Sequence, residues 1–293
     1  MAVAILGVHA TGPRATAQAQ AARLTLEEVR TVLRTTRDLA GKDLSGLRLA
    51  KVNLRGADLT GANLTGTDLR EARLEGARLR RAALRRANLA EANLHQADLG
   101  GADLREADLR RANLSEADAS GADLTAARLG GAYLAAANLR RARLTRADLA
   151  GAYPPGAILT AADLTEATLT GANLAGVYAE RTILDGARLD GADLTGGYLA
   201  GASLVRASLA GARLRVANLD RTNLLAADLR GADLGAAYLG GANLSRANLA
   251  GADLAQADLA DADLDEADLT RARSEGVRGL DRARNRATAK GLR

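Results

Sequence analysis

The sequence lacks several residue types on which many functions depend. Its 293 residues include no cysteine, no phenylalanine and no tryptophan, and only two histidines. Without cysteine, the chain has no disulfides, no thiol nucleophile and no cysteine metal site. No apolar run approaches the ~20 residues of a membrane-spanning helix. Because only 2% of the residues are aromatic, a core built from large side chains is also excluded.

One pentapeptide pattern dominates what is present. Leucine fills 43 of the 46 positions spaced by five from Leu44 to Leu269, and the exceptions are Ala119, Pro154 and Ala179. Alanine fills 38 of the 46 positions that lie two residues earlier. The unit is Ala-(Asp/Asn)-Leu-x-x, and such internal repetition decides the fold before local helix or strand propensity does.

The period of five excludes the two simplest structures. On an α-helix, five residues advance by a net ~140°, so the leucines would spiral around the surface without forming an apolar stripe. On a flat strand, side chains alternate with a period of two, so every other leucine would face the wrong side. A short extended stretch followed by a turn in each unit resolves the conflict, with leucine and alanine inward and Asp/Asn outward. The turn positions often end in glycine, which tolerates positive φ.

Units such as Ala57-Asp58-Leu59-Thr60-Gly61 resemble the pentapeptide-repeat family, and the resemblance covers residues 42–273. It implies an all-β solenoid, a right-handed quadrilateral β-helix with four units per coil and roughly 11 to 12 coils over ~55 Å. It also implies one alternative function, a DNA-mimic-like binder and protector of DNA gyrase of the quinolone-resistance type. Such mimicry needs a markedly acidic rod. The repeats carry 29 basic and 30 acidic residues, so gyrase binding is the minority hypothesis.

The two ends differ from the repeats. Residues 1–22 are expected to be a disordered leader, which slightly favours the cytoplasm; the alternative is a signal-peptide remnant of an exported protein, because 2–8 is apolar. Within residues 23–41, Thr25 followed by Glu28 is a capping-box signature that predicts a short helical cap at about 25–37. Residues 274–293 are expected to form a basic cap or tail, a helical cap with a frayed end. The resemblance also allows a homodimer through this tail.

Arginines gather at outward positions in the first half of the repeats. With four units per coil, they are expected to share one corner of the rod, where two groups recur ~14 Å apart. The corner would suit phosphate or an acidic partner, but acidic residues lie between the groups, so a solvated face is favoured. The residues are Arg78, Arg80, Arg81, Arg85, Arg86, Arg140, Arg141, Arg143 and Arg146.

All five tyrosines directly precede a central position and are expected to face outward; they are Tyr133, Tyr153, Tyr178, Tyr198 and Tyr238. Tyr133 and Tyr153 are 20 residues apart, as are Tyr178 and Tyr198, so each pair is expected to stack on adjacent coils. Exposed aromatic residues can anchor an interface. Packing between coils explains them at least as well.

Pro154 and Pro155 form the one sharp irregularity of the repeat. Pro154 occupies a leucine position and has no N–H for a ladder between coils. Leu149 and Leu159 keep the register, so nothing is inserted. The sequence therefore predicts a local distortion or a kink in the middle of the rod.

Nothing in the sequence resembles a catalytic or cofactor site. His9 lies in the leader and His95 at an outward repeat position, so neither has a converging set of partners. The sequence predicts a non-enzymatic interaction or structural scaffold with no cofactor, no metal and an unidentified protein partner. Phosphate or nucleic-acid contact through the arginine corner is the second alternative, and the lack of interleaved aromatics argues against it.

Overall fold

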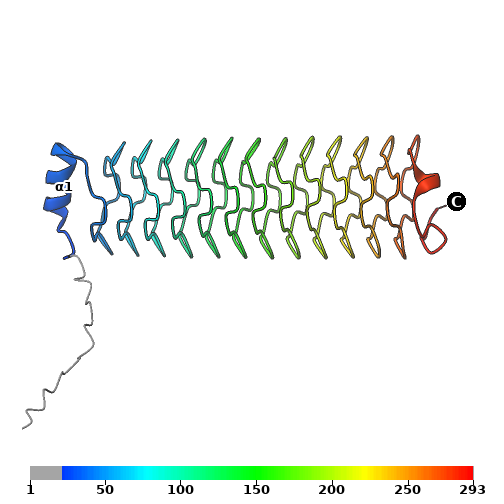
Figure 1. Ribbon diagram of the computed structural model, residues 1–293, viewed down its shortest axis with the longest axis horizontal. Helices are drawn as coiled ribbons and strands as arrows, with labels where there is room; N and C mark the ends of the chain where they lie inside the picture. Colours follow the sequence, from blue (N-terminus) through cyan, green and yellow to red (C-terminus); the bar gives the residue numbers. More distant parts are fainter. Residues whose placement is uncertain (1–21, 293) are drawn as a thin grey trace, which may run out of the picture.

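The computed structural model describes residues 22–292, which form a straight rod (Figure 1). Along the regular repeats, parallel β-bridges connect the residue before a leucine to the residue 20 positions later, as in Asp58↔Arg78 and Arg78↔Asp98. Twenty residues are four pentapeptides, so four units complete one coil. The expected quadrilateral β-helix is confirmed, and so is the number of units per coil.

The unit from Asp58 to Ala62 shows why the pentapeptide recurs. Its N–H groups donate in turn to Arg37 O (3.0 Å) on the preceding coil, Arg78 O (2.7 Å) on the next coil, the Asp58 side chain (2.9 Å), Arg80 O (2.8 Å) and Leu59 O (3.0 Å). All five N–H groups are thereby paired, as buried backbone requires. The residue after leucine has no backbone partner, and the Asp or Asn two positions earlier supplies one.

This turn-capping role for Asp and Asn is absent from the sequence analysis, which placed these side chains only as outward. Hydrogen bonds from the Thr60 side chain and backbone hold the pKa of the Asp58 carboxyl below its usual value. The same direction and cause apply to Asp43, whose carboxyl accepts hydrogen bonds from Ser45. At these two turns, the Asp therefore stabilises the turn in its charged form.

The core consists of stacked leucine and alanine columns. Every leucine from Leu39 to Leu269 at the repeat position is buried, and a buried leucine contributes about 1.5–3 kcal/mol. Three threonines replace alanine, and each hydroxyl donates to a backbone carbonyl. Thr67 bonds Leu44 O at 3.0 Å, Thr182 bonds Leu159 O at 2.7 Å, and Thr222 bonds Leu219 O. The column therefore accepts threonine without leaving a buried hydroxyl unpaired.

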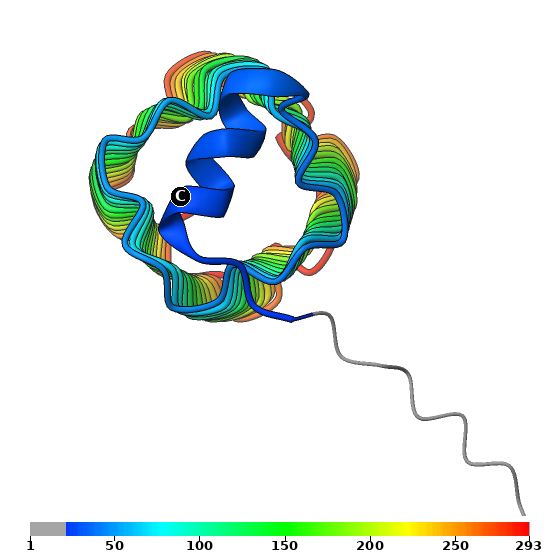
Figure 2. The ribbon, with the colours of Figure 1, turned by 90° about the vertical axis from the view of Figure 1, so that its left-hand side faces the viewer.

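Helix α1 (Leu26–Thr35) lies across the open end of the first coil (Figure 2). The predicted capping box is present: the Thr25 hydroxyl accepts from the Glu28 N–H, and the Glu28 carboxylate accepts from the Thr25 N–H. Val29 is the one fully buried residue of the helix, with Leu26, Val32 and Leu33 packed around the same core. The helix thus covers the apolar end that a solenoid would otherwise expose.

The far end differs from the expected helical cap. Only η1 (Leu280–Arg282) is helical. The tail instead continues the ladder, with bridges Asp258↔Arg278, Asp263↔Arg284 and Asp268↔Lys290. These partners are six residues apart rather than five, so the tail wraps the last coil with wider turns. The helical prediction is wrong because backbone N–H groups of the tail form hydrogen bonds with that coil instead of within a helix.

Of the local distortion or kink expected at Pro154, the local distortion is present and the rod remains straight (Figure 1). The effect of Pro154 on the ladder is local. Tyr153 forms no bridge with Asn173, but the Asn173 N–H still donates to Ala152 O at 3.0 Å. Pro155 falls at the position whose N–H the Asp or Asn normally caps. Tyr153 cannot cap there, and proline needs no cap. Only the hydrogen bond that an N–H at position 154 would donate to the next coil is lost, and the backbone of the coil follows the same course as its neighbours.

The predicted leader, residues 1–22, lies outside the described residues except for its last position. Across residues 22–292, no helix combines the length and apolarity that crossing a bilayer would require.

Candidate interaction surface

All five tyrosines lie on two adjacent sides of the rod. Tyr133 and Tyr153 are bridged to each other on one side. Tyr178 and Tyr198 are bridged on the next side, and the same ladder continues through Asn218 to Tyr238. Each tyrosine is about half exposed, between 44% and 53%. We name the two sides, with the corner between them, the tyrosine edge.

One of the two expected aromatic stacks forms. The Tyr178 and Tyr198 rings are parallel within 3°, with centroids 5.1 Å apart. Tyr133 and Tyr153 are bridged but do not stack, and within residues 22–292 the Tyr178–Tyr198 pair is the one stacked pair. The prediction of a second stack is wrong, and Tyr153 is also the residue at which the ladder is interrupted. The stacked rings contact each other through their faces and leave their edges outward.

The centre of the tyrosine edge carries no charge. From Tyr133 to Tyr178, both sides and the corner hold only aromatic, aliphatic, small and amide residues, whereas 26% of the chain is charged. The corner positions are Ala135, Ala136, Pro155, Gly156, Ala175 and Gly176, and the sides add Asn138, Ile158 and Asn173. Small corner residues leave the tyrosines and Ile158 as the raised features of the surface.

Val216, at the same corner, has a strained backbone. Its φ is 50° and its side chain is 49% exposed. Every residue at this turn position has positive φ, but the others are glycine, charged, amide or alanine residues. A β-branched residue in this region is an outlier, and such strain often marks a functional position. Val216 lines a shallow surface groove with Tyr198, Asn218 and Tyr238.

Val216→Gly is expected to raise the free energy of unfolding by about 1 kcal/mol, because glycine relieves the left-handed strain. Thermal and urea unfolding of the variant would measure the change. The matched control is Ala226→Gly, at a turn with φ 55° and no β-branched side chain, where a smaller gain is expected. Equal stability of Val216→Gly and the native chain would show that Val216 is not strained.

The arginines do not share one corner, contrary to the prediction. The Arg81 N–H donates to Gly100 O and the Arg86 N–H to Arg105 O, so the two residues belong to different columns of turns. Arg80 and Arg81 recur at Arg140 and Arg141, while Arg86 recurs at Arg146 on the next corner. Successive units turn by a quarter of the coil, and this separates residues five positions apart. Arg143 lies on the side between these corners, and Arg78 on the side before them.

Most of these arginines are paired with carboxylates on neighbouring coils. Arg85 and Arg86 contact Glu106 at 2.7 and 2.8 Å. Their hydrogen bonds, Arg86 first, lower the pKa of Glu106 to about 2. Similar exposed pairs are Arg78–Asp58 (3.4 Å), Arg80–Asp98 (3.4 Å) and Arg146–Glu166 (2.8 Å). The arginines therefore form a mixed-charge surface, which favours the solvated-face interpretation over a phosphate strip.

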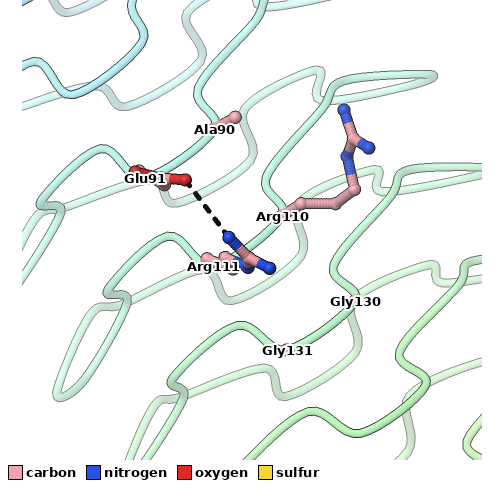
Figure 3. A pocket seen from close by; sticks show the side chains of 6 residues that line it. All are labelled: Ala90, Glu91, Arg110, Arg111, Gly130 and Gly131. Carbon is pink, nitrogen blue, oxygen red and sulfur yellow. Dashed lines mark ion pairs between the residues drawn. The ribbon is translucent and has the colours of Figure 1, made fainter.

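A depression of the surface lies at another corner (Figure 3). Gly130 and Gly131 form its floor, and Arg110 and Arg111 border it. Arg111 pairs with Glu91 at 3.6 Å and Arg110 with Asp108 at 2.5 Å. Both guanidinium groups thus have carboxylate partners, and the depression is open. It lacks the convergent groups of a ligand or catalytic site.

His95 is the one histidine of residues 22–292. His95 Nδ1 lies 3.0 Å from the Ser115 carbonyl oxygen on the next coil, a contact that needs no catalytic role. No group of three or more His, Asp or Glu residues within 22–292 is placed to hold a metal ion. The tyrosine edge is therefore the most distinctive surface that these residues present.

Comparison with known proteins agrees with this architecture. The family model described as "Pentapeptide repeats" matches in eight copies, over residues 38–66, 67–105, 87–125, 127–153, 157–196, 198–235 and 236–273. HetL, a pentapeptide-repeat protein involved in heterocyst differentiation regulation from the cyanobacterium Nostoc, is 32% identical. The match covers 92% of this chain and 95% of HetL, with a TM-score of 0.29.

Two further solved structures are similar in sequence pattern. Rfr23 from the cyanobacterium Cyanothece is 28% identical over 50% of this chain and 94% of its own, with a TM-score of 0.22. QnrB1, a plasmid-mediated fluoroquinolone resistance protein, is 17% identical over 73% and 90%, with a TM-score of 0.26. The QnrB1 similarity carries no functional argument at that level. Among curated proteins, none matches significantly.

Proposed function

Because the chain belongs to the pentapeptide-repeat family, we propose that it is a non-enzymatic scaffold that binds a protein partner through the tyrosine edge. The observation that carries the proposal is the placement of every aromatic residue on two adjacent sides, whose shared corner carries no charge between the coils of Tyr133 and Tyr178.

The composition of the edge supports a docking role. Interface centres are rich in tyrosine and poor in charge, while their rims are polar. Tyrosine also supplies a large contact area with few rotatable bonds, and tyrosines are common among the residues that dominate binding energy. The exposed Val216 adds an apolar side chain that the fold holds outward at a conformational cost.

The two alternatives have less support. A DNA-like decoy for gyrase needs dense negative charge along the rod, but residues 42–150 carry 19 basic and 14 acidic residues. Only residues 151–273 are acidic, with 10 basic and 16 acidic residues. Nucleic-acid contact through arginine is weakened by the carboxylate partners of Arg80, Arg85 and Arg86.

Site-specific photo-crosslinking tests the docking role. A photoreactive amino acid would replace Tyr178 on the edge or, as the matched control, Arg188 on the opposite side, in the native host. We expect a defined crosslinked protein adduct from position 178 and none from 188. Adducts of equal yield at both positions, or at 188 alone, would contradict docking through the tyrosine edge.

A further inference from the structure

The tyrosine edge continues beyond its uncharged centre in both directions, and both continuations carry charges of both signs. Asp58, Asp98 and Asp118 lie toward α1, and Arg213, Arg215 and Arg273 lie toward the tail. Toward α1, its outward positions include Arg73 and Arg78, both exposed. Toward the tail, the corresponding positions hold Asp253 and Asp258. The uncharged coils that contain Tyr153 and Tyr178 lie midway between these two sets.

We propose that a second copy of this chain occupies the tyrosine edge, lying antiparallel and related by a twofold axis that crosses the edge between the coils of Tyr153 and Tyr178. This inference rests on the proposed docking role and names the occupant. With that axis, Ile158 faces Tyr178 of the second copy, and Tyr153 faces Asn173 of the second copy. A twofold interface of this type is self-complementary by symmetry.

In this register, four pairs of opposite charges face each other along the rest of the edge. Arg73 faces Asp253 of the second copy, and Arg78 faces Asp258. One coil further out, Arg55 faces Glu275 and Asp58 faces Arg278. Nearer the centre, Glu116 meets the coil that holds Arg215. No two like charges face each other at matched positions along this edge.

The parallel arrangement fails the same test. With an axis along the rod, the two sides of the edge would face each other coil by coil. Arg73 would then meet Arg78, and Asp253 would meet Asp258. Like charges brought together cost free energy and select against a wrong arrangement. The facing charges at these matched positions therefore favour the antiparallel arrangement over the parallel one.

The available area suits a specific dimer. Roughly 11 to 12 coils at ~4.8 Å give an edge of ~55 Å. A standard specific interface buries about 800 Å² on each copy, so along this edge it requires a contact strip ~15 Å wide. Three of these edge charges already have partners within the same rod: Arg73 with Glu75 at 3.8 Å, Arg78 with Asp58 at 3.4 Å and Asp253 with Arg273 at 2.9 Å. These pairs are exposed, and exposed pairs rearrange at little cost.

Charge reversal tests the register. We expect native protein to sediment as a dimer. The variant Arg73→Asp/Arg78→Asp and the variant Asp253→Arg/Asp258→Arg should each bind themselves at least tenfold more weakly, because like charges meet at both ends. An equimolar mixture should recover near-native affinity as a heterodimer, because both ends are then opposite in charge. Size-tagging one variant makes the heterodimer visible by sedimentation velocity.

Controls separate this inference from the proposed function. Arg188→Asp on the opposite side should leave the dimer unchanged, and circular dichroism should show that each variant is folded. A native monomer at all concentrations, or no recovery in the mixture, overturns the inference. If the chain is monomeric while position 178 crosslinks a different protein, the docking role stands and only the antiparallel dimer fails. Absence of both results would overturn both.

Discussion

Replacing Leu144 with alanine is expected to lower the free energy of unfolding by about 3–5 kcal/mol, because the side chain is fully buried and its removal leaves a cavity. Leu144 lies near the middle of the rod, where each coil contacts only its two neighbours. A cavity there should weaken the coupling between the two halves, and unfolding should separate into two transitions. Chemical denaturation followed by circular dichroism would measure both effects.

The matched control is Leu269→Ala, at the last regular leucine position. The same atoms are removed, but the flanking structure is a tail of irregular turns that can fray without involving the rest of the rod. We expect a smaller loss and a single main transition. If Leu144→Ala and Leu269→Ala lost equal stability with equal cooperativity, the rod would not behave as a linear array of coupled coils.

The second large effect concerns α1. Val29→Asp is expected to detach the helix, because an unpaired carboxylate cannot remain in the apolar site that Val29 fills, at a cost on the order of 3 kcal/mol or more. The first coil would then expose its leucines and its unpaired backbone edge. Open edges of this kind pair with other chains. Static light scattering should show large assemblies in place of the native species.

Arg30→Ala provides the comparison, since Arg30 is on the exposed surface of α1 and pairs only with Glu27 at 2.5 Å. Exposed pairs contribute little, about 0.2–1 kcal/mol. This variant should keep the native mass and a nearly native unfolding temperature. Large assemblies from Arg30→Ala, or their absence from Val29→Asp, would show that helix coverage is not what keeps the end of the rod closed.

The period of five was sufficient to predict a coiled solenoid with inward leucines, since no regular helix or strand satisfies that period. The capping box located α1 to within two residues at its C-terminal end. The tail was predicted wrongly because its bridging residues, Arg278, Arg284 and Lys290, are spaced by six. A sequence pattern with a period of five does not indicate pairing between residues spaced by six. Residue types in the tail resemble those of a helix, and tertiary pairing decides its structure.

The surface was harder to predict, because the place of a side chain depends on two spacings: 20 residues lead to the next coil on the same side, and five residues lead to the next side. Spacing by 20 correctly placed Tyr178 beside Tyr198. The step of five moves a residue to the next side. The prediction overlooked this step for Arg81 and Arg86 and therefore placed both at one corner. The same step places Tyr153 next to the Tyr178 side and creates the edge. The strain at Val216 follows from its turn position, but the sign of its φ required the backbone.

The quarter turn between successive units also constrains how such a chain can change its length during evolution. Duplicating or deleting 20 residues would lengthen or shorten the rod and leave every downstream residue on its original side. Losing a single pentapeptide between Tyr153 and Tyr178 would rotate everything after it by one side, and the two tyrosine columns would coincide instead of flanking a corner. The buried core would be unchanged, because all four sides use the same leucine and alanine. Genes for such rods should therefore tolerate changes of whole coils, while loss of one unit would abolish recognition in a protein that still folds.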